Sequence, residues 1–317
     1  MSDAAHLLIP FASCGQAGCV QARRTLRLPM LDKLLTRLKP AAVDEGDEHM
    51  LSMPHERVLA REHGLTAQDG RTPWAAWHVL QAARDPGRDA WAWVTPCHWQ
   101  VGQDHIAMTH PRRLELTVGE SQALLAAMQP YFEQDGIALE YDAPTRWLAR
   151  GAVFDGFASA SLDRVIGHEI GSWLPQGDQG RTVRRLQQEM QMLLYTHEVY
   201  DKRTHRGLPP VNSFWVSGTG SLPAATRAPT KSALQVEESL RDAALLQDWG
   251  AWVSCWQRVD GHECTRLLER LDRGEHVALT LCGERSARTF AGTGGGMFGK
   301  IAAALKPRHA AGVLDSL

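Results

Sequence analysis

Two neighbouring residues, His55 and Glu56, have the side-chain types best suited to proton or phosphoryl transfer in this sequence. They follow Pro54 at the start of a predicted helix over residues 54–63. An imidazole can accept a phosphoryl group or exchange a proton near neutral pH, and an adjacent carboxylate can assist it. We therefore treat His55 and Glu56 as candidate catalytic residues. The alternative is an ordinary histidine at a helix start.

A second group of reactive residue types comprises Cys97, His98, Asp104 and His105. Thiolate, imidazole and carboxylate groups all suit zinc. Adjacent residues point to opposite faces of a strand, so the four side chains converge only if the chain turns at Gly102. A divalent metal is therefore an open cofactor prediction. A packed strand and loop is the alternative, and His98 is also a candidate ligand-binding residue.

Arg71 directly follows Gly70 and is a candidate for binding a phosphate. A guanidinium group can donate two parallel hydrogen bonds to a phosphate or carboxylate. The alternative is a turn arginine in a solvent-facing ion pair, which would contribute little.

Cys14 and Cys19 flank Gly15 and Gly18 just after a strand predicted over residues 6–12. This pair suits a redox role, and two ordinary reduced thiols are the alternative. The six cysteines show no CxxC spacing, the N-terminal residues lack the features of a secretory signal, and no apolar run reaches transmembrane length. We therefore expect a cytoplasmic protein with reduced thiols and no membrane partner.

The composition is that of an ordinary globular protein, with 44% hydrophobic residues, 22% charged residues and a net charge of −2. Without a basic stripe, nucleic acid is not an expected partner. The predicted strands alternate with predicted helices, which indicates an α/β fold. Strands are predicted over residues 6–12, 90–95, 137–141, 211–216 and 276–282, and helices over residues 29–38, 54–63, 117–132, 183–199, 232–247 and 263–271.

Residues 197–220 contain the clearest motif. Eight of these 24 residues match, without a gap, a pattern of the cofactor-independent phosphoglycerate mutases, which the chain resembles in their archaeal-type branch. Glu198 and Tyr200 depart from that pattern, which has proline and asparagine there. The resemblance implies Arg203 and Asn212 as candidate ligand-binding residues, with a structural role as the alternative. The matching residues are His197, Arg203, Gly207, Pro210, Asn212, Trp215, Gly218 and Gly220.

Weaker matches lie at residues 28–34, 70–76 and 96–99, in the order in which the family has them. The resemblance thus covers most of residues 6–220. It implies an α/β fold made of a truncated alkaline-phosphatase-like core and an inserted, smaller α+β cap domain. The expected domains are a discontinuous core over residues 1–80 and 211–317 and a cap over residues 81–210.

Members of the family transfer phosphate through a phosphoserine with the help of two divalent ions. Residues 11–15 lack the acid that the family has after its first strand. His55 and Glu56 stand where the family has its nucleophilic serine, and residues 282–284 stand where it has a late Asp–His pair. The chain therefore resembles degenerate, bacterial members of the family. We expect a binding or regulatory protein that senses a small phosphorylated metabolite.

Two other functions remain open. One is an active phosphotransferase or phosphatase with a site rebuilt around His55, Arg71 and His98. The other is a structural protein that binds a protein partner, for which exposed members of the 11 tryptophans would be the sign.

Overall fold

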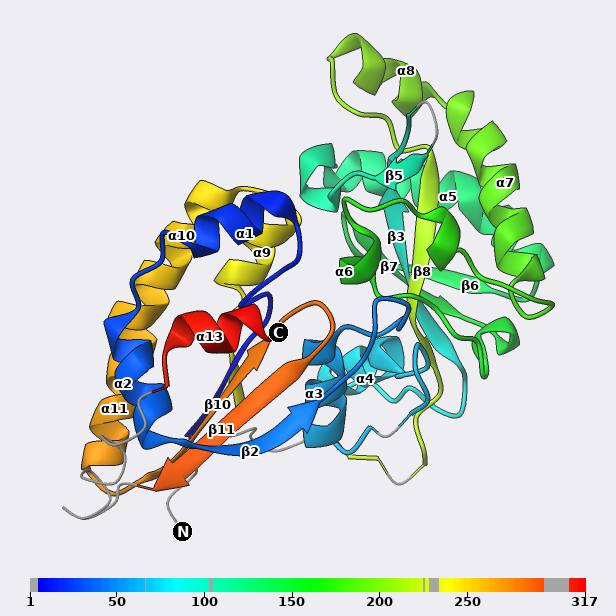
Figure 1. The fold of residues 1–317 in the computed structure, drawn as a ribbon. Helices are drawn as coiled ribbons and strands as arrows, with labels where there is room; N and C mark the ends of the chain where they lie inside the picture. Colours follow the sequence, from blue (N-terminus) through cyan, green and yellow to red (C-terminus); the bar gives the residue numbers. More distant parts are fainter. Residues whose placement is uncertain (1–4, 66, 103–104, 225, 228–233, 294–307) are drawn as a thin grey trace. The chain divides into compact units, whose positions relative to one another are not determined.

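The computed structural model describes residues 5–65, 67–102, 105–224, 226–227, 234–293 and 308–317. Helices and strands follow one another along the chain, which confirms the predicted α/β class (Figure 1). The chain divides into two compact units. The first comprises Met1–His49, Met53–His63 and Pro229–Leu317, and the second comprises Met50–Ser52 and Gly64–Ala228.

These units divide the chain at other positions than the expected 80/81 and 210/211. Helix α4 (Trp74–Gln81) packs against strands β3 (Trp91–Cys97) and β8 (Ser213–Gly220), and β8 pairs with β3. The segments before residue 81 and after residue 210 that form these contacts therefore belong to the second unit. Both units are discontinuous in sequence, and the two segments of the second lie between the three segments of the first.

The first unit contains a five-stranded mixed sheet in the order β2-β11-β10-β1-β9. Strand β1 is parallel to β9 and β10, whereas β11 is antiparallel to both β10 and β2. Leu7, Leu8 and Ile9 are all buried, as expected for a strand covered on both faces. Pro40 lies in the exposed edge strand β2, where a missing N–H is tolerated. The strands are β1 (Ala5–Ile9), β2 (Lys39–Asp44), β9 (Leu234–Val236), β10 (His276–Cys282) and β11 (Ala287–Thr293).

Helices cover this sheet. In α3, Val58 shares a buried cluster with Leu8 and Cys282. Figure 1 shows α1, α2, α10 and α11 together along one side of the sheet, and α11 packs against β10 and α2. The helical segments are α1 (Ala17–Arg23), α2 (Pro29–Arg37), α3 (Pro54–Glu62), α9 (Ser239–Leu245), α10 (Trp249–Val259), the π-turn η4 (Asp260–Cys264), α11 (Thr265–Asp272) and α13 (Ala310–Asp315).

The second unit is built on an antiparallel sheet in the order β6-β7-β3-β8. Met128 and Phe132 of α5 and Leu186 and Met190 of α7 share one buried core with Trp147 of this sheet. The remaining elements are β4 (Trp99–Val101), β5 (Ile106–Met108), η1 (Pro111–Leu114), α5 (Val118–Gln134), β6 (Ala138–Ala143), β7 (Arg146–Arg150), η2 (Ala152–Phe154), α6 (Leu162–Val165), η3 (Gly171–Trp173), α7 (Arg181–Tyr195) and α8 (Glu198–His205).

Several predicted elements need correction. The helix predicted over residues 183–199 is two helices: α7 ends at Tyr195 with Thr196 as its C-cap, and His197 caps α8 by accepting from Val199 N (3.2 Å). The helix predicted over residues 232–247 is β9 followed by α9. Strands β2 and β11 and helix α10 were not predicted. In the part of the chain that the structure describes, no helix has the length and apolarity needed to cross a bilayer.

Candidate functional site

Two tryptophans of α10 hold the loop that follows β1. Trp252 Nε1 donates to the carbonyl oxygen of Phe11 (3.0 Å), and Trp256 Nε1 donates to that of Ala12 (3.2 Å). Phe11 has a φ of 51°, in the left-handed region that side chains other than glycine rarely adopt. The indole groups thus satisfy buried carbonyls of a strained turn and tie it to α10.

His55 lies beside this loop, in the first turn of α3. It is only 5% exposed, and its ring centroid lies 5.9 Å from that of Phe11. Glu56 accepts a hydrogen bond from Met53 N (2.9 Å) through Oε2, so its carboxylate caps the helix. The first candidate catalytic residue is therefore packed against an aromatic ring, and the second has a structural contact.

The turn after β10 reaches the same place. Glu284 Oε2 accepts from Gly15 N (2.6 Å), and Cys282 O accepts from Ala12 N (2.8 Å). The loop after β1 therefore contacts both the start of α3, through Phe11, and the turn after β10. These are the three segments that the resemblance assigns to catalysis. Across the described residues, no group of three or more His, Cys, Asp or Glu side chains could hold a metal ion.

The predicted metal cluster in the second unit is not supported as a ligand set. Cys97 is buried at the end of β3, and burial raises the pKa of its thiol well above the usual range. His98 Nδ1 donates to the carbonyl oxygen of Pro210 (2.8 Å); burial lowers the pKa of this imidazole, and the charge of Arg203 lowers it further. His105 is exposed, and Asp104 lies outside the described residues.

Arg203 and Asn212 hold the chain around β3 together. Arg203 is fully buried, and its guanidinium donates to Glu120 Oε2 (3.0 Å), to the carbonyl oxygen of Pro209 (3.0 Å) and to that of Leu114. Asn212 accepts from Trp99 N (2.7 Å) and donates to Trp99 O (3.0 Å), as a neighbouring strand would. Both residues of the motif are thus engaged with the protein itself, as the structural alternative predicts.

Arg71 lines a cavity of about 240 Å³ within the second unit, together with Phe157, Thr219 and Gly220. Its guanidinium donates to Gln68 Oε1 (2.7 Å). His98 is not among the residues that line this cavity, so the two predicted ligand-binding residues do not share it.

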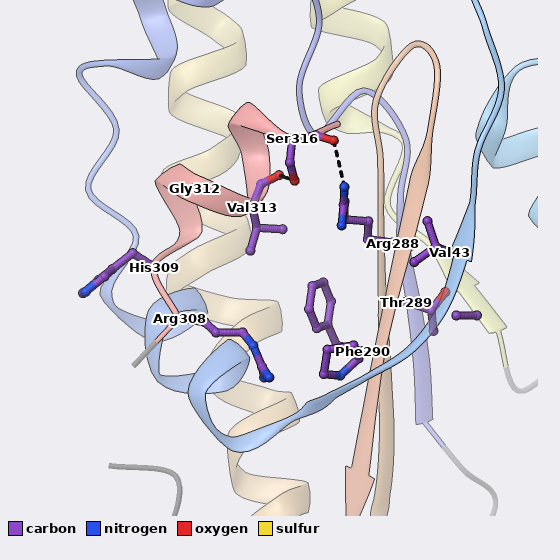
Figure 2. A pocket seen from close by; sticks show the side chains of 11 residues that line it. Val43, Arg288, Thr289, Phe290, Arg308, His309, Gly312, Val313 and Ser316 are labelled. Atoms are coloured by element: carbon purple, nitrogen blue, oxygen red, sulfur yellow. Dashed lines mark hydrogen bonds between the residues drawn. The ribbon is translucent and has the colours of Figure 1, made fainter. Parts of the chain in front are cut away.

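A cavity of about 320 Å³ lies in the first unit, between α13 and strands β2 and β11; we call it the α13 cavity (Figure 2). Figure 2 shows the Arg288 and Arg308 side chains on either side of the Phe290 ring, while His309 points away. The lining residues are Pro40, Ala42, Val43, Arg288, Thr289, Phe290, Arg308, His309, Gly312, Val313 and Ser316, with no Asp or Glu among these described residues.

The two arginines of the α13 cavity are only partly engaged. Arg308 Nη1 donates to Leu38 O (2.8 Å), and Arg288 Nη2 makes a long bond to Ser316 O (3.4 Å). The buried Nε of Arg288 has no hydrogen-bond partner within the described part of the chain. A buried donor without an acceptor costs free energy, so the Arg288 guanidinium is incompletely satisfied by the described part of the chain.

Sequence reasoning did not find the α13 cavity. Its walls come from β2, β11 and α13, and neither strand was predicted. A signal was present in residues 287–293, where a β pattern places Arg288 and Phe290 on one face. Sequence spacing alone does not bring Arg308 beside them.

Comparisons with known proteins give only a remote likeness. No family model matches the chain, and no curated protein matches it. Five chains of solved structures match it. The structure titled "Cofactor-Independent Phosphoglycerate mutase from Thermoplasma Acidophilum DSM 1728" is 13% identical, with a TM-score of 0.37, over 99% of this chain and 98% of that one. The PH0037 protein from Pyrococcus horikoshii is 12% identical, with a TM-score of 0.40, over 99% of this chain and 96% of that one.

The expected resemblance therefore stays a distant likeness to these structures. At these values neither structure supports an inference about activity or ligands. Function must be argued from the residues of this chain.

Proposed function

We propose that this protein binds a small anionic metabolite, such as a phosphate ester, in the α13 cavity and acts as a binding or regulatory protein. The observation that supports this proposal is the pair of guanidinium groups, Arg288 and Arg308, in a cavity without a lining carboxylate. His309 Nδ1 lies 3.9 Å from Asp32, and the two arginines are the lining side chains that carry a permanent positive charge.

The other walls of the cavity define the rest of the ligand. Phe290, Val43 and Val313 provide apolar surface between the arginines and α13. Guanidinium groups bind phosphate and carboxylate oxygens through paired hydrogen bonds, and a volume of about 320 Å³ accommodates a small organic molecule. The ligand that fits combines one anionic group with a compact apolar or ring-bearing part.

The proposal includes loss of the bimetal chemistry of the mutases. At the three segments that the resemblance assigns to catalysis, the chain has Phe11, His55 and Glu284 instead of an acid, a serine and an Asp–His pair. A covalent mechanism without its nucleophile loses many orders of magnitude in rate. We expect no manganese-dependent isomerisation of phosphoglycerate, and robust turnover in that assay would contradict this part of the proposal.

Neither of the other two functions has a supporting observation. Arg71 and His98 do not line a common cavity. All 11 tryptophans lie in the described residues, and none is among the exposed large hydrophobic side chains, so the sign expected of a partner-binding surface is missing from them.

Calorimetric titration tests the binding site. Phenyl phosphate should bind more tightly than inorganic phosphate, and phenol should not bind measurably. Arg288→Met should weaken phenyl phosphate binding at least tenfold, which corresponds to about 1.4 kcal/mol. Arg285→Met is the matched control, because Arg285 is exposed and its ion pair with Glu48 is long at 3.7 Å. Equal binding by Arg288→Met and the wild type, or equal binding of phenol, would refute the proposed site.

A further inference from the structure

The cavity of about 240 Å³ in the second unit, which we call the Arg71 cavity, has walls from three stretches of the chain. Hydrogen bonds join these walls: Thr219 Oγ1 donates to Phe157 O (2.6 Å), and Ser159 N donates to Gly70 O (2.9 Å). Walls that are tied together favour a cavity that is formed before a ligand binds, as most small-molecule sites are. The stretches lie within residues 64–73, 155–157 and 219–223.

The lining of the Arg71 cavity combines buried apolar surface with charge. Leu65 and Phe157 are 4% and 2% exposed, whereas Arg71 is half-buried and Asp155 is exposed. Arg71 and Asp155 are the two charged side chains among the described residues that line the cavity. A ligand in this cavity therefore meets an apolar floor and one charge of each sign.

The two charges of the Arg71 cavity lack ion-pair partners within the described residues. In that part of the chain, the Arg71 side chain has one hydrogen bond, to the neutral amide of Gln68 (2.7 Å), and neither Arg71 nor Asp155 takes part in an ion pair. Both line one cavity, yet they do not neutralise each other by direct contact. Opposite charges arranged in this way can each bind one end of a ligand that carries both charges.

We propose that the Arg71 cavity binds a small zwitterion, a free α-amino acid with an aliphatic side chain. The guanidinium of Arg71 donates to the α-carboxylate, and the carboxylate of Asp155 accepts from the α-ammonium group. The aliphatic side chain packs on Leu65, Pro73 and Phe157, which line the cavity. The volume of about 240 Å³ lies below the usual range for drug-sized ligands and suits a molecule as small as an amino acid.

The charges of the Arg71 cavity disfavour other classes of ligand. A phosphate ester, the ligand predicted for Arg71, would place a strongly negative group in the same cavity as the Asp155 carboxylate. An amine without a carboxylate would place its charge in the same cavity as the Arg71 guanidinium. The α13 cavity differs, because its described lining residues include two arginines and no carboxylate. The two sites therefore select ligands of different charge, and each can be tested without the other.

Calorimetric titration of the full chain near neutral pH tests the site with L-leucine and two analogues that each keep one charge. Leucine should bind more tightly, by about tenfold or more, than 4-methylpentanoate, which lacks the ammonium group. It should exceed 3-methylbutylamine, which lacks the carboxylate, by a similar factor. Equal binding of either analogue, or no detectable binding of leucine, would overturn the proposal.

Variants separate the contributions of the two charges. Arg71→Met and Asp155→Asn should each weaken leucine binding by about tenfold or more. Asp155→Asn should not weaken binding of 4-methylpentanoate, because it removes a repulsion. Neither variant should change phenyl phosphate binding in the α13 cavity. Leucine binding that stays unchanged in Arg71→Met or in Asp155→Asn would refute the site.

Arg181→Met and Asp178→Asn are the matched controls. Arg181 and Asp178 form an exposed ion pair in the same unit and are not among the residues that line the Arg71 cavity. Both controls should bind leucine as the wild type does. A loss as large as that of Arg71→Met would show that the effect does not come from the cavity. Thermal unfolding checks that each variant is folded.

Discussion

Arg203 in the second unit and Arg288 in the first are arginines in opposite situations. Arg203 is fully buried, and each of its three nitrogens donates to a protein oxygen. Arg288 lines a cavity, keeps one buried nitrogen without a partner and makes a single long bond to Ser316. The first guanidinium is inaccessible and bound at every nitrogen, whereas the second lines a cavity and is only partly engaged.

The difference shows that a motif match and a binding role are separate questions. Arg203 matches the family pattern, yet its bonds join α8 to the start of α5 through Glu120. Arg288 matches no motif. What a guanidinium already binds is a better guide to its function than its place in a pattern, because an engaged group must lose those bonds before it can bind a ligand.

The largest expected effect is on stability, from Arg203→Met. Removal of the guanidinium leaves the carbonyls of Leu114 and Pro209 without their donor and Glu120 without its buried partner. Breaking one side of a buried pair typically costs 3–5 kcal/mol. Because Glu120 retains some exposure, we expect the free energy of unfolding to fall by about 3 kcal/mol in urea denaturation.

Arg206→Met is the matched control, because Arg206 contacts the same carboxylate at 3.3 Å but from an exposed position. It should leave stability almost unchanged. If Arg203→Met and Arg206→Met lower the free energy of unfolding by the same amount, the buried arginine does not stabilise the protein more than the exposed one.

A smaller effect on stability is expected from Trp252→Phe. Its comparison with Trp93→Phe tests whether an indole that donates a hydrogen bond matters more than one that does not. The substitution removes the donor for the Phe11 carbonyl and leaves a buried acceptor unpaired, at a cost of about 1–3 kcal/mol. In Trp93→Phe the buried Nε1 that is lost has no hydrogen-bond partner among the described residues. The first variant should therefore be the less stable one by thermal unfolding, and the reverse order would contradict the role given to α10.

Part of the fold could be predicted because local signals agreed with the final structure. The bounds of β10 follow from an apolar run, and α5 begins after Thr117, whose Oγ1 accepts from Glu120 N (3.2 Å) as the capping box predicts. Strand β2 was missed because Pro40 indicated a helix end and its exposed residues do not alternate. Helix α10 was missed although Asp248 provides its cap, accepting from Ala251 N (2.9 Å).

The candidate sites were harder to predict because they depend on long-range pairing. The residue types of His55 and Arg71 suggest chemistry. The sequence does not show that the Phe11 ring packs on His55 or that Arg71 lines a cavity. The α13 cavity joins residues about 250 positions apart, because β2 pairs with β11. Such pairing depends on the register of the whole sheet, which no short motif encodes.

Arg288→Met should change stability less than Arg203→Met or Trp252→Phe. It replaces an unpaired buried donor with an apolar chain and removes only one long hydrogen bond. We expect a change of less than about 1 kcal/mol in unfolding free energy, while phenyl phosphate binding weakens at least tenfold. A loss as large as that of Arg203→Met would show that Arg288 is a structural residue too.

The smallest expected effect is a pH dependence that involves the Arg203 region. Burial lowers the pKa of His6, His63 and His98 in the folded chain below the unfolded value of 6.5, and the charge of Arg203 adds to this at His98. The unfolded state therefore binds more protons as the pH falls through 6.5, so stability present above that pH decreases below it. Urea denaturation at pH 7.5 and 5.5 should show this loss. His98→Gln should reduce the loss, whereas substitution of the exposed His105 by glutamine should not. An unchanged pH dependence in His98→Gln would mean that His98 is not protonated on unfolding in this range.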